Sequence, residues 1–114
     1  MAVPTGLIRP GEAQGLAKAV ADWRAWLTHE RRASPHTLAA YGRDLDAFLD
    51  FLTDHLGAVP DLDALRALQP TDFRAWLARR AADGLARSST ARALSVVRGF
   101  FRFLERTGRG GGGG

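Results

Sequence analysis

The side chains with the most reactive chemistry stand close together in the stretch HERRASPHTLAAY, residues 29–41. His29 and Arg32 form a His-x-x-Arg pair, and the single tyrosine of the chain, Tyr41, follows nine residues after that arginine. Cations around a tyrosine hydroxyl suit attack on a phosphodiester, because they stabilise the charge that develops on the phosphate. The first question is whether this stretch is a catalytic site or the meeting point of two helices.

The neighbouring residues favour the structural interpretation. Ser34-Pro35 predicts a helix start, since serine caps a first turn and proline loses no hydrogen bond at the first helical position. The preceding helix must therefore end near Arg32, which separates the His-x-x-Arg pair from Tyr41. Tyr41 lies three residues after Leu38 and four before Leu45, at core-type spacing. We expect Tyr41 to be packed, with its hydroxyl at the edge of the core.

No other motif for catalysis or metal binding is present in the sequence. There is no cysteine, and His29, His36 and His55 lack metal-ligand spacing. The sequence has no glycine-rich phosphate loop followed by Lys-Ser/Thr, and no Ser-His-Asp signature. We therefore expect a chain that is not an enzyme by itself and that takes no metal, cofactor or small-molecule ligand.

Hydrophobic periodicity predicts an all-α fold of four principal helices with short connections. The expected helices run over about 16–31, 35–56, 71–83 and 88–107, with a helical turn within 61–68. Residues 1–15 contain two prolines and three glycines and are expected to form a flexible arm. The ordered domain is expected to cover residues 16–108, followed by a glycine-rich linker or tail over 109–114.

Length and composition fit one small domain. The chain has 114 residues, of which 46% are hydrophobic, enough for a core and too many for global disorder. No stretch approaches the roughly 20 apolar residues of a membrane span. The N-terminal residues also lack the basic and then apolar pattern of a secretory signal. A cytoplasmic location is the expectation.

Charge is unevenly distributed along the chain. The formal net charge is +4, and 15 of the 16 basic residues are arginine. Between Asp44 and Asp63 there are six acids and no Lys or Arg, whereas eight arginines and two acids follow from Arg79 onward. A basic end of this kind suits a phosphate-rich partner. A solvated arginine-rich surface is the plainer alternative.

The segment 88–107 carries the best candidate for a binding surface. Opposite its apolar side, small and basic residues recur every three or four positions: Ser88, Arg92, Ser95, Gly99, Arg102 and Arg106. Small residues let a helix approach nucleic acid closely, while the arginines reach phosphates or guanine edges. The helix start, with Arg87, Ser88, Ser89 and Thr90, adds N–H groups and hydroxyls that favour an anion. The plainer interpretation is that Ser88 or Ser89 is only an N-cap.

The segment 35–56 repeats this arrangement more weakly. Its start offers the hydroxyls of Ser34 and Thr37 and the imidazole of His36. Its polar side continues through Ala40 and Arg43, although alanine is also simply a strong helix former. Two polar helix starts suggest a clamp on one groove, but sequence spacing does not place them side by side.

Four pieces of the sequence together resemble the N-terminal core-binding domain of tyrosine site-specific recombinases, particularly the bacterial Xer type and related phage integrases. The pieces are WRAWLTHERRASPHTLAAYGRDL (23–45), FLDFL (48–52), DFRAWLARR (72–80) and GLARSSTARALSVVRGFFRFL (84–104). Each piece alone is weak, but their order and spacing extend over about residues 16–108.

The resemblance implies a SAM-like, orthogonal four-helix domain that binds duplex DNA and takes part in DNA recombination or integration. Its second and fourth helices would sit over the major groove of a recombination half-site. Carried over by position, the implied DNA contacts are His36, Thr37, Ala40, Arg43, Arg87, Ser88, Ser89, Thr90, Arg92 and Ser95, and the periodic row adds Arg102. The catalytic residues of the family belong to a C-terminal domain, so His29, Arg32 and Tyr41 are expected to have no catalytic role.

Other partners and other classes of protein also have to be considered. The resemblance implies further recombinase protomers in a tetrameric synapse, for which an exposed Trp26 is the candidate contact. A helix-turn-helix transcription regulator would need a second helix three or four residues after the first and a dimer element, and neither is clear. A helical protein–protein interaction module would respond to an acidic protein instead of DNA. Chromosome dimer resolution, phage integration and mobile-element movement all stay open as biological roles.

Overall fold

A computed structural model describes residues 10–109, with side chains from Gly15 onward, and this range holds five helices and no strand. The helices are α2 (Pro10–His29), α3 (Pro35–Leu56), α4 (Leu62–Arg66), α5 (Pro70–Ala82) and α6 (Arg87–Arg106). The predicted all-α fold, with four long helices and one short helical segment, is confirmed. Among the helices described, none is long and apolar enough to cross a membrane.

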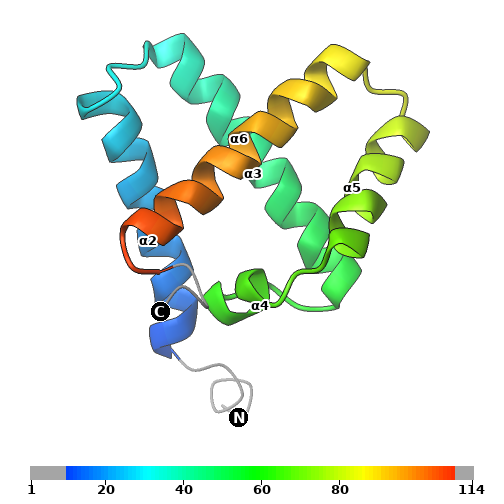
Figure 1. The fold of residues 1–114 in the computed structure, drawn as a ribbon, viewed down its shortest axis with the longest axis horizontal. Coiled ribbons are helices and arrows are strands. Elements are labelled where there is room, and N and C mark those ends of the chain that lie inside the picture. Colours follow the sequence, from blue (N-terminus) through cyan, green and yellow to red (C-terminus); the bar gives the residue numbers. More distant parts are fainter. Residues whose placement is uncertain (1–9, 110–114) are drawn as a thin grey trace, which may run out of the picture.

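The long helices form a cross with two arms (Figure 1). α6 crosses α3, and α2 and α5 flank this pair on either side. The end of α2 and the start of α3 make one upper arm, and the end of α5 and the start of α6 make the other. The short α4 lies at the opposite edge, and the two connections at the upper edge are short turns between long helices.

The core lies where α2, α3, α5 and α6 meet, and aromatic rings dominate it. Phe48 is 1% exposed; its ring lies 4.9 Å from that of Trp76, edge to face, and 5.8 Å from that of Phe73, stacked. On the other side of α6, the rings of Trp23 and Phe100 meet edge to face at 5.5 Å. Such offset and edge-to-face pairs are the favoured aromatic arrangements. Phe101 of α6 lies edge to face with Phe48 and Phe73, so aromatic contacts hold α6 between α2 and the α3–α5 pair.

Local sequence signals set both ends of α3, as predicted. The Ser34 hydroxyl accepts a hydrogen bond from the Thr37 amide at 3.1 Å, and Pro35 occupies the first helical position. The helix ends at Gly57, whose φ of 84° lies in the left-handed region that glycine adopts without steric cost. Tyr41 packs half-buried against the core, as expected.

The start of α2 differs from the prediction. The helix begins at Pro10 instead of near Leu16, so residues 10–15 are helical and not part of an arm. Residues 1–9 and 110–114 lie outside the described range. Glycine usually weakens a helix, but a Cβ at position 15 would lie only 3.3 Å from Cδ1 of Leu62. Gly15 therefore leaves room for the Leu62 side chain where α2 lies against α4.

The start of α5 is fixed by a carboxylate. α5 begins at Pro70 with Gln69 as N-cap, slightly before the expected start near Thr71. The Asp72 carboxylate accepts a hydrogen bond from the Gln69 amide at 2.7 Å and lies 2.8 Å from Nε2 of His55. The Gln69 amide and then His55 hold the pKa of Asp72 below its usual value.

Stability should therefore fall in acid, partly through Asp72. Because the folded-state pKa is below the unfolded value, this contribution is present above pH about 4 and is lost as the pH falls through the folded pKa. We expect the urea concentration at the unfolding midpoint to decrease when the pH falls below about 4. This decrease should be smaller in Asp72→Asn than in the parent chain. Circular dichroism melts in urea at neutral and acidic pH measure this. Equal drops in the two proteins would contradict the assignment.

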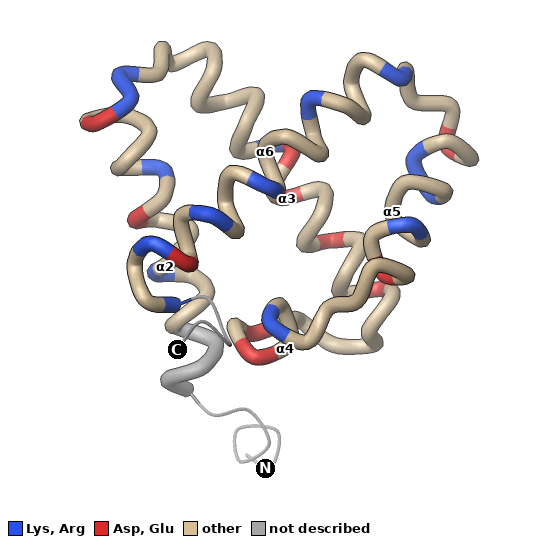
Figure 2. Tube along the Cα trace, in the orientation of Figure 1, with Lys and Arg blue, Asp and Glu red and all other residues tan. Residues whose placement is uncertain are grey.

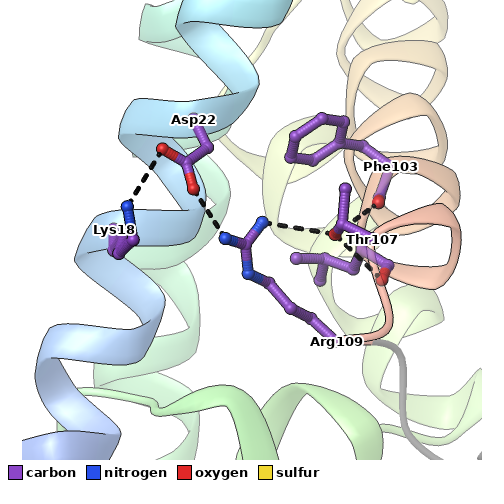
Figure 3. Close-up of polar contacts among 6 residues, drawn as sticks. Lys18, Asp22, Phe103, Thr107 and Arg109 are labelled. Carbon is purple, nitrogen blue, oxygen red and sulfur yellow. Dashed lines mark hydrogen bonds and ion pairs between the residues drawn. The ribbon is translucent and has the colours of Figure 1, made fainter.

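Arg109 fastens the end of α6 to α2 (Figure 3). Its guanidinium donates to Oδ2 of Asp22 at 2.6 Å and to the Thr107 hydroxyl at 3.2 Å, and Lys18 lies 3.5 Å from the other Asp22 oxygen. Arg66 of α4 donates to the Arg109 carbonyl at 3.1 Å. The hydrogen bond from Arg109 is the main cause that lowers the pKa of Asp22. These bonds form an Arg109 clasp that ties the end of α6 to both α2 and α4.

Candidate nucleic-acid interface

An open groove of about 630 Å³ lies between the end of α2, the start of α3 and the face of α6. Four arginines line it, and none of its lining residues is acidic. We call it the arginine groove; its arginines are Arg31, Arg92, Arg102 and Arg106. Small or hydroxyl-bearing residues, Thr37, Ser95 and Gly99, stand between the cations, over a floor that includes Trp26. A site that is cationic and open in this way suits an extended anion.

Trp26 holds two of these arginines in place. The guanidinium carbons of Arg31 and Arg106 lie 5.5 and 4.9 Å from the centre of its ring, within the range of cation–π attraction. The ring also packs against Phe103, with centroids 5.6 Å apart. The expected exposed Trp26 is therefore wrong, because these contacts half-bury the side chain. Its contact with another protomer stays a prediction.

Arg92 has a second role where α6 crosses α3. Its Nε and Nη2 donate to the two carboxylate oxygens of Asp44 at 2.8 and 3.1 Å. The Asp44 side chain is 8% exposed and that of Arg92 is 50% exposed. This two-point ion pair raises the pKa of Arg92 further. Arg92 therefore also stabilises the fold through its ion pair with Asp44. Its position in the periodic row of α6 did not indicate this structural role.

The start of α6 differs from the prediction. The N-cap is Ala86 and the first helical residue is Arg87, so neither Ser88 nor Ser89 caps the helix. Gly84, at φ 79°, ends α5, and the Leu85 amide donates to the Arg80 carbonyl at 3.1 Å. This tight turn is complete before Ala86, so α6 begins at once. The Ser88 and Ser89 hydroxyls thus belong to the first turn and are not needed as caps.

Thr90 has a structural partner in the same region. Nε of Arg80 donates to the Thr90 hydroxyl at 2.9 Å. Arg80 is itself buried, with its guanidinium carbon 5.6 Å from the centre of the Trp76 ring. Thr90 therefore ties the first turn of α6 to α5, a role that sequence spacing did not reveal.

The predicted contact residues fall into three groups. Those that line the arginine groove are Thr37, Arg92, Ser95 and Arg102. Those at the start of α6 are Arg87, Ser88, Ser89 and Thr90, of which the first two are exposed. Those on the first turns of α3 outside the groove are His36, Ala40 and Arg43, with Ala40 half-buried. The starts of α3 and α6 lie on separate arms of one edge, so they are not side by side (Figure 1).

Basic and acidic residues gather on different parts of the molecule. Figure 2 shows basic residues on both upper arms and along α6, whereas α3 carries acids from its crossing with α6 downward. These acids are Asp44, Asp46, Asp50 and Asp54. Arg31 and Trp26 also line the groove and were not predicted as DNA contacts, because they lie near the end of α2 and belong to no periodic row.

The fold and the groove define a class of protein: a small all-helical, SAM-like domain with a basic face. The family described as "Phage integrase, N-terminal SAM-like domain" matches residues 20–108, and the chain belongs to this family. The resemblance drawn from the four sequence pieces is thereby confirmed.

Individual relatives carry one name. Tyrosine recombinase XerC of Rhodospirillum centenum is 50% identical over 92 residues, which are 81% of this chain and 27% of that protein. Tyrosine recombinase XerC of Bradyrhizobium diazoefficiens is 50% identical over 95 residues, 83% of this chain and 30% of the relative. Tyrosine recombinase XerC of Methylobacterium nodulans is 49% identical over 98 residues, which are 86% of this chain and 30% of that protein. The chain thus spans less than a third of the length of these relatives, and no solved structure matches it significantly.

Proposed function

We propose that this chain is the DNA-binding core-binding domain of a XerC-type tyrosine recombinase. The observation that carries the proposal is the arginine groove, with four arginines and no acid among its lining residues. Neutralising phosphates with Arg and Lys supplies most of the affinity of proteins for duplex DNA. Arg31 and Arg106 suit this role because Trp26 orients them, and no carboxylate pairs with either one among the residues described.

The contact is expected to spread from the groove to both arms. Ser95 and Gly99 leave α6 narrow between Arg92 and Arg102, which lets a sugar–phosphate backbone approach the helix. Arg43 on α3 and Arg87 on α6 are exposed and extend the cationic surface along the two arms. We expect the isolated domain to bury roughly 600–1,000 Å² and to bind with a Kd of about 1–100 µM at physiological salt.

The similarity to XerC proteins supports a proposal for the role of this domain in a whole recombinase. In the whole protein, this domain would hold one side of a recombination half-site while a further domain cleaves and rejoins the strands. His29, Arg32 and Tyr41 take no part in that chemistry. Protomers bound to neighbouring half-sites would assemble into a tetrameric synapse.

A salt titration with a matched pair of variants tests DNA binding. Fluorescence anisotropy of a labelled duplex gives Kd at several salt concentrations for the parent chain, Arg102→Ala and Arg74→Ala. Both arginines are exposed, but Arg102 lines the arginine groove and Arg74 lies on α5, outside it. The slope of log K against log salt should become shallower by about 1 in Arg102→Ala and stay unchanged in Arg74→Ala.

Two results would count against the proposal. The chain could fail to bind any duplex at low salt, or the two variants could lose affinity equally. Equal losses would mean that net charge alone, and not the arginine groove, attracts the DNA. Amide shifts in NMR spectra offer a second check, because they should concentrate in residues 31–43 and 87–106.

A further inference from the structure

A second groove, of about 730 Å³, lies between α5 and α6. We call it the apolar groove, since most of its wall is hydrophobic: Leu68, Phe73, Leu77, Leu94, Val97 and Phe101. Three arginines and a single acid stand among these side chains: Arg74, Arg98, Arg102 and Glu105. The groove therefore offers hydrophobic contact within a net positive border.

The end of α3 and the connector that follows it also expose hydrophobic side chains, but the charges that flank them are negative. Three large apolar side chains are exposed in the described part of the chain, and two of them stand here: Leu56, the last residue of α3, and Val59 in the connector. Val59 is 77% exposed. Asp54 and Asp63 flank it, and each also pairs with an arginine of its own chain, Arg79 and Arg66 respectively. Both acids are largely exposed, so exchanging these partners costs little.

We propose that the apolar groove of one copy of this chain receives the Leu56–Val59 knob of a second copy. Hydrophobic surface would meet hydrophobic surface, and the flanking acids would meet the border arginines. Leu68 lines both the apolar groove and the hollow beside the connector, so knob and groove are neighbours on one molecule. Neighbouring complementary surfaces permit a two-fold pair in which each copy gives a knob and receives one.

The proposal does not depend on DNA binding. The knob and most of the apolar groove lie apart from the arginine groove, and Arg102 is the one arginine that lines both. The knob offers only two apolar side chains, so the pair should be weak, with a Kd between about 1 µM and 1 mM. With such an affinity, few free chains would pair at low concentration. Pairing would increase when DNA or another scaffold holds two copies close together, because their effective concentration rises.

Sedimentation velocity of the 114-residue chain without DNA tests the pairing. Between about 10 µM and 1 mM at low salt, the chain should shift from monomer towards dimer. Val59→Asp should weaken the pairing at least about tenfold, because it places a charge in the hydrophobic contact. Leu85→Asp is the matched control, since Leu85 is 45% exposed and lies at the α5–α6 turn, away from the knob. Arg98→Glu should weaken the pairing as well.

Several outcomes would overturn the proposal. A chain that stays monomeric at every concentration has no such contact, and a dimer that Val59→Asp leaves intact uses another surface. A monomeric chain whose groove amides, around Phe73 and Leu77, shift only on adding an acidic amphipathic peptide would assign the groove to a different partner. Circular dichroism separates unfolding from loss of contact, because the exposed Val59 lies outside the core.

Discussion

Replacing Arg92 with glutamate is expected to destabilise the fold much more than a half-exposed position on α6 usually allows. Asp44 lies buried beneath it and accepts both of its hydrogen bonds. Leaving this Asp44 carboxylate buried without its partner is destabilising, and a second carboxylate beside it adds repulsion. Urea unfolding followed by circular dichroism should show a clearly lower midpoint for Arg92→Glu than for Arg92→Gln.

The double variant Asp44→Asn with Arg92→Gln is the control for this prediction. It removes both charges and keeps polar groups in place, so most of the lost stability should return. Were the double variant no more stable than Arg92→Glu, the ion pair would not be the cause. Loss of DNA binding by Arg92→Glu alone therefore identifies no DNA contact, whereas affinity measured in the folded double variant reports the DNA role of Arg92 itself.

Replacing Phe48 with alanine should remove a large part of the stability of the domain. The Phe48 ring contacts the rings of Phe73 and Trp76 and lies 6.3 Å from that of Phe101, so it joins α3 to α5 and α6. Truncating a buried phenylalanine costs about 3–5 kcal/mol, against a total of about 5–15 kcal/mol for a typical domain. Thermal and urea melts measure the loss.

Two further variants calibrate the Phe48 result. Phe48→Leu keeps most of the volume and should cost less, about 1–2 kcal/mol. Phe73→Ala removes the same group from a half-buried position and should also cost less than Phe48→Ala. If Phe73→Ala proved the more damaging, the centre of the core would lie nearer to the start of α5 than the ring contacts indicate.

Features that depend on near neighbours in the chain were predictable from the sequence. Ser34, Pro35 and Gly57 set the ends of α3 through contacts within a few residues. Helical spacing predicted that Tyr41 and Leu45 face the core, and both side chains pack there. The row along α6 correctly predicted that Arg92, Ser95 and Arg102 share one surface.

Features that depend on distant parts of the chain were not predictable in this way. Asp44 and Arg92 are 48 residues apart, and nothing in either local sequence indicates the other. Gly15 resembles an arm residue until Leu62 is known to face it. A serine near the start of α6 is a sound expectation for a cap, but the turn closed by Leu85 and Arg80 starts the helix earlier. The ion pair and the Gly15 contact thus depend on residues far apart in the sequence, whereas the error at the start of α6 arose because a local backbone turn replaced a side-chain cap.

The Arg109 clasp also determines how mechanical load passes through the domain. A pull on the chain after Arg109 would be resisted by Asp22 on α2 and by Arg66 on α4, before it could peel the last turn of α6 from the core. One turn further along α2, Trp26 lies in the arginine groove. Tension at the C-terminal end and contact in the groove would therefore both act on α2, one turn apart.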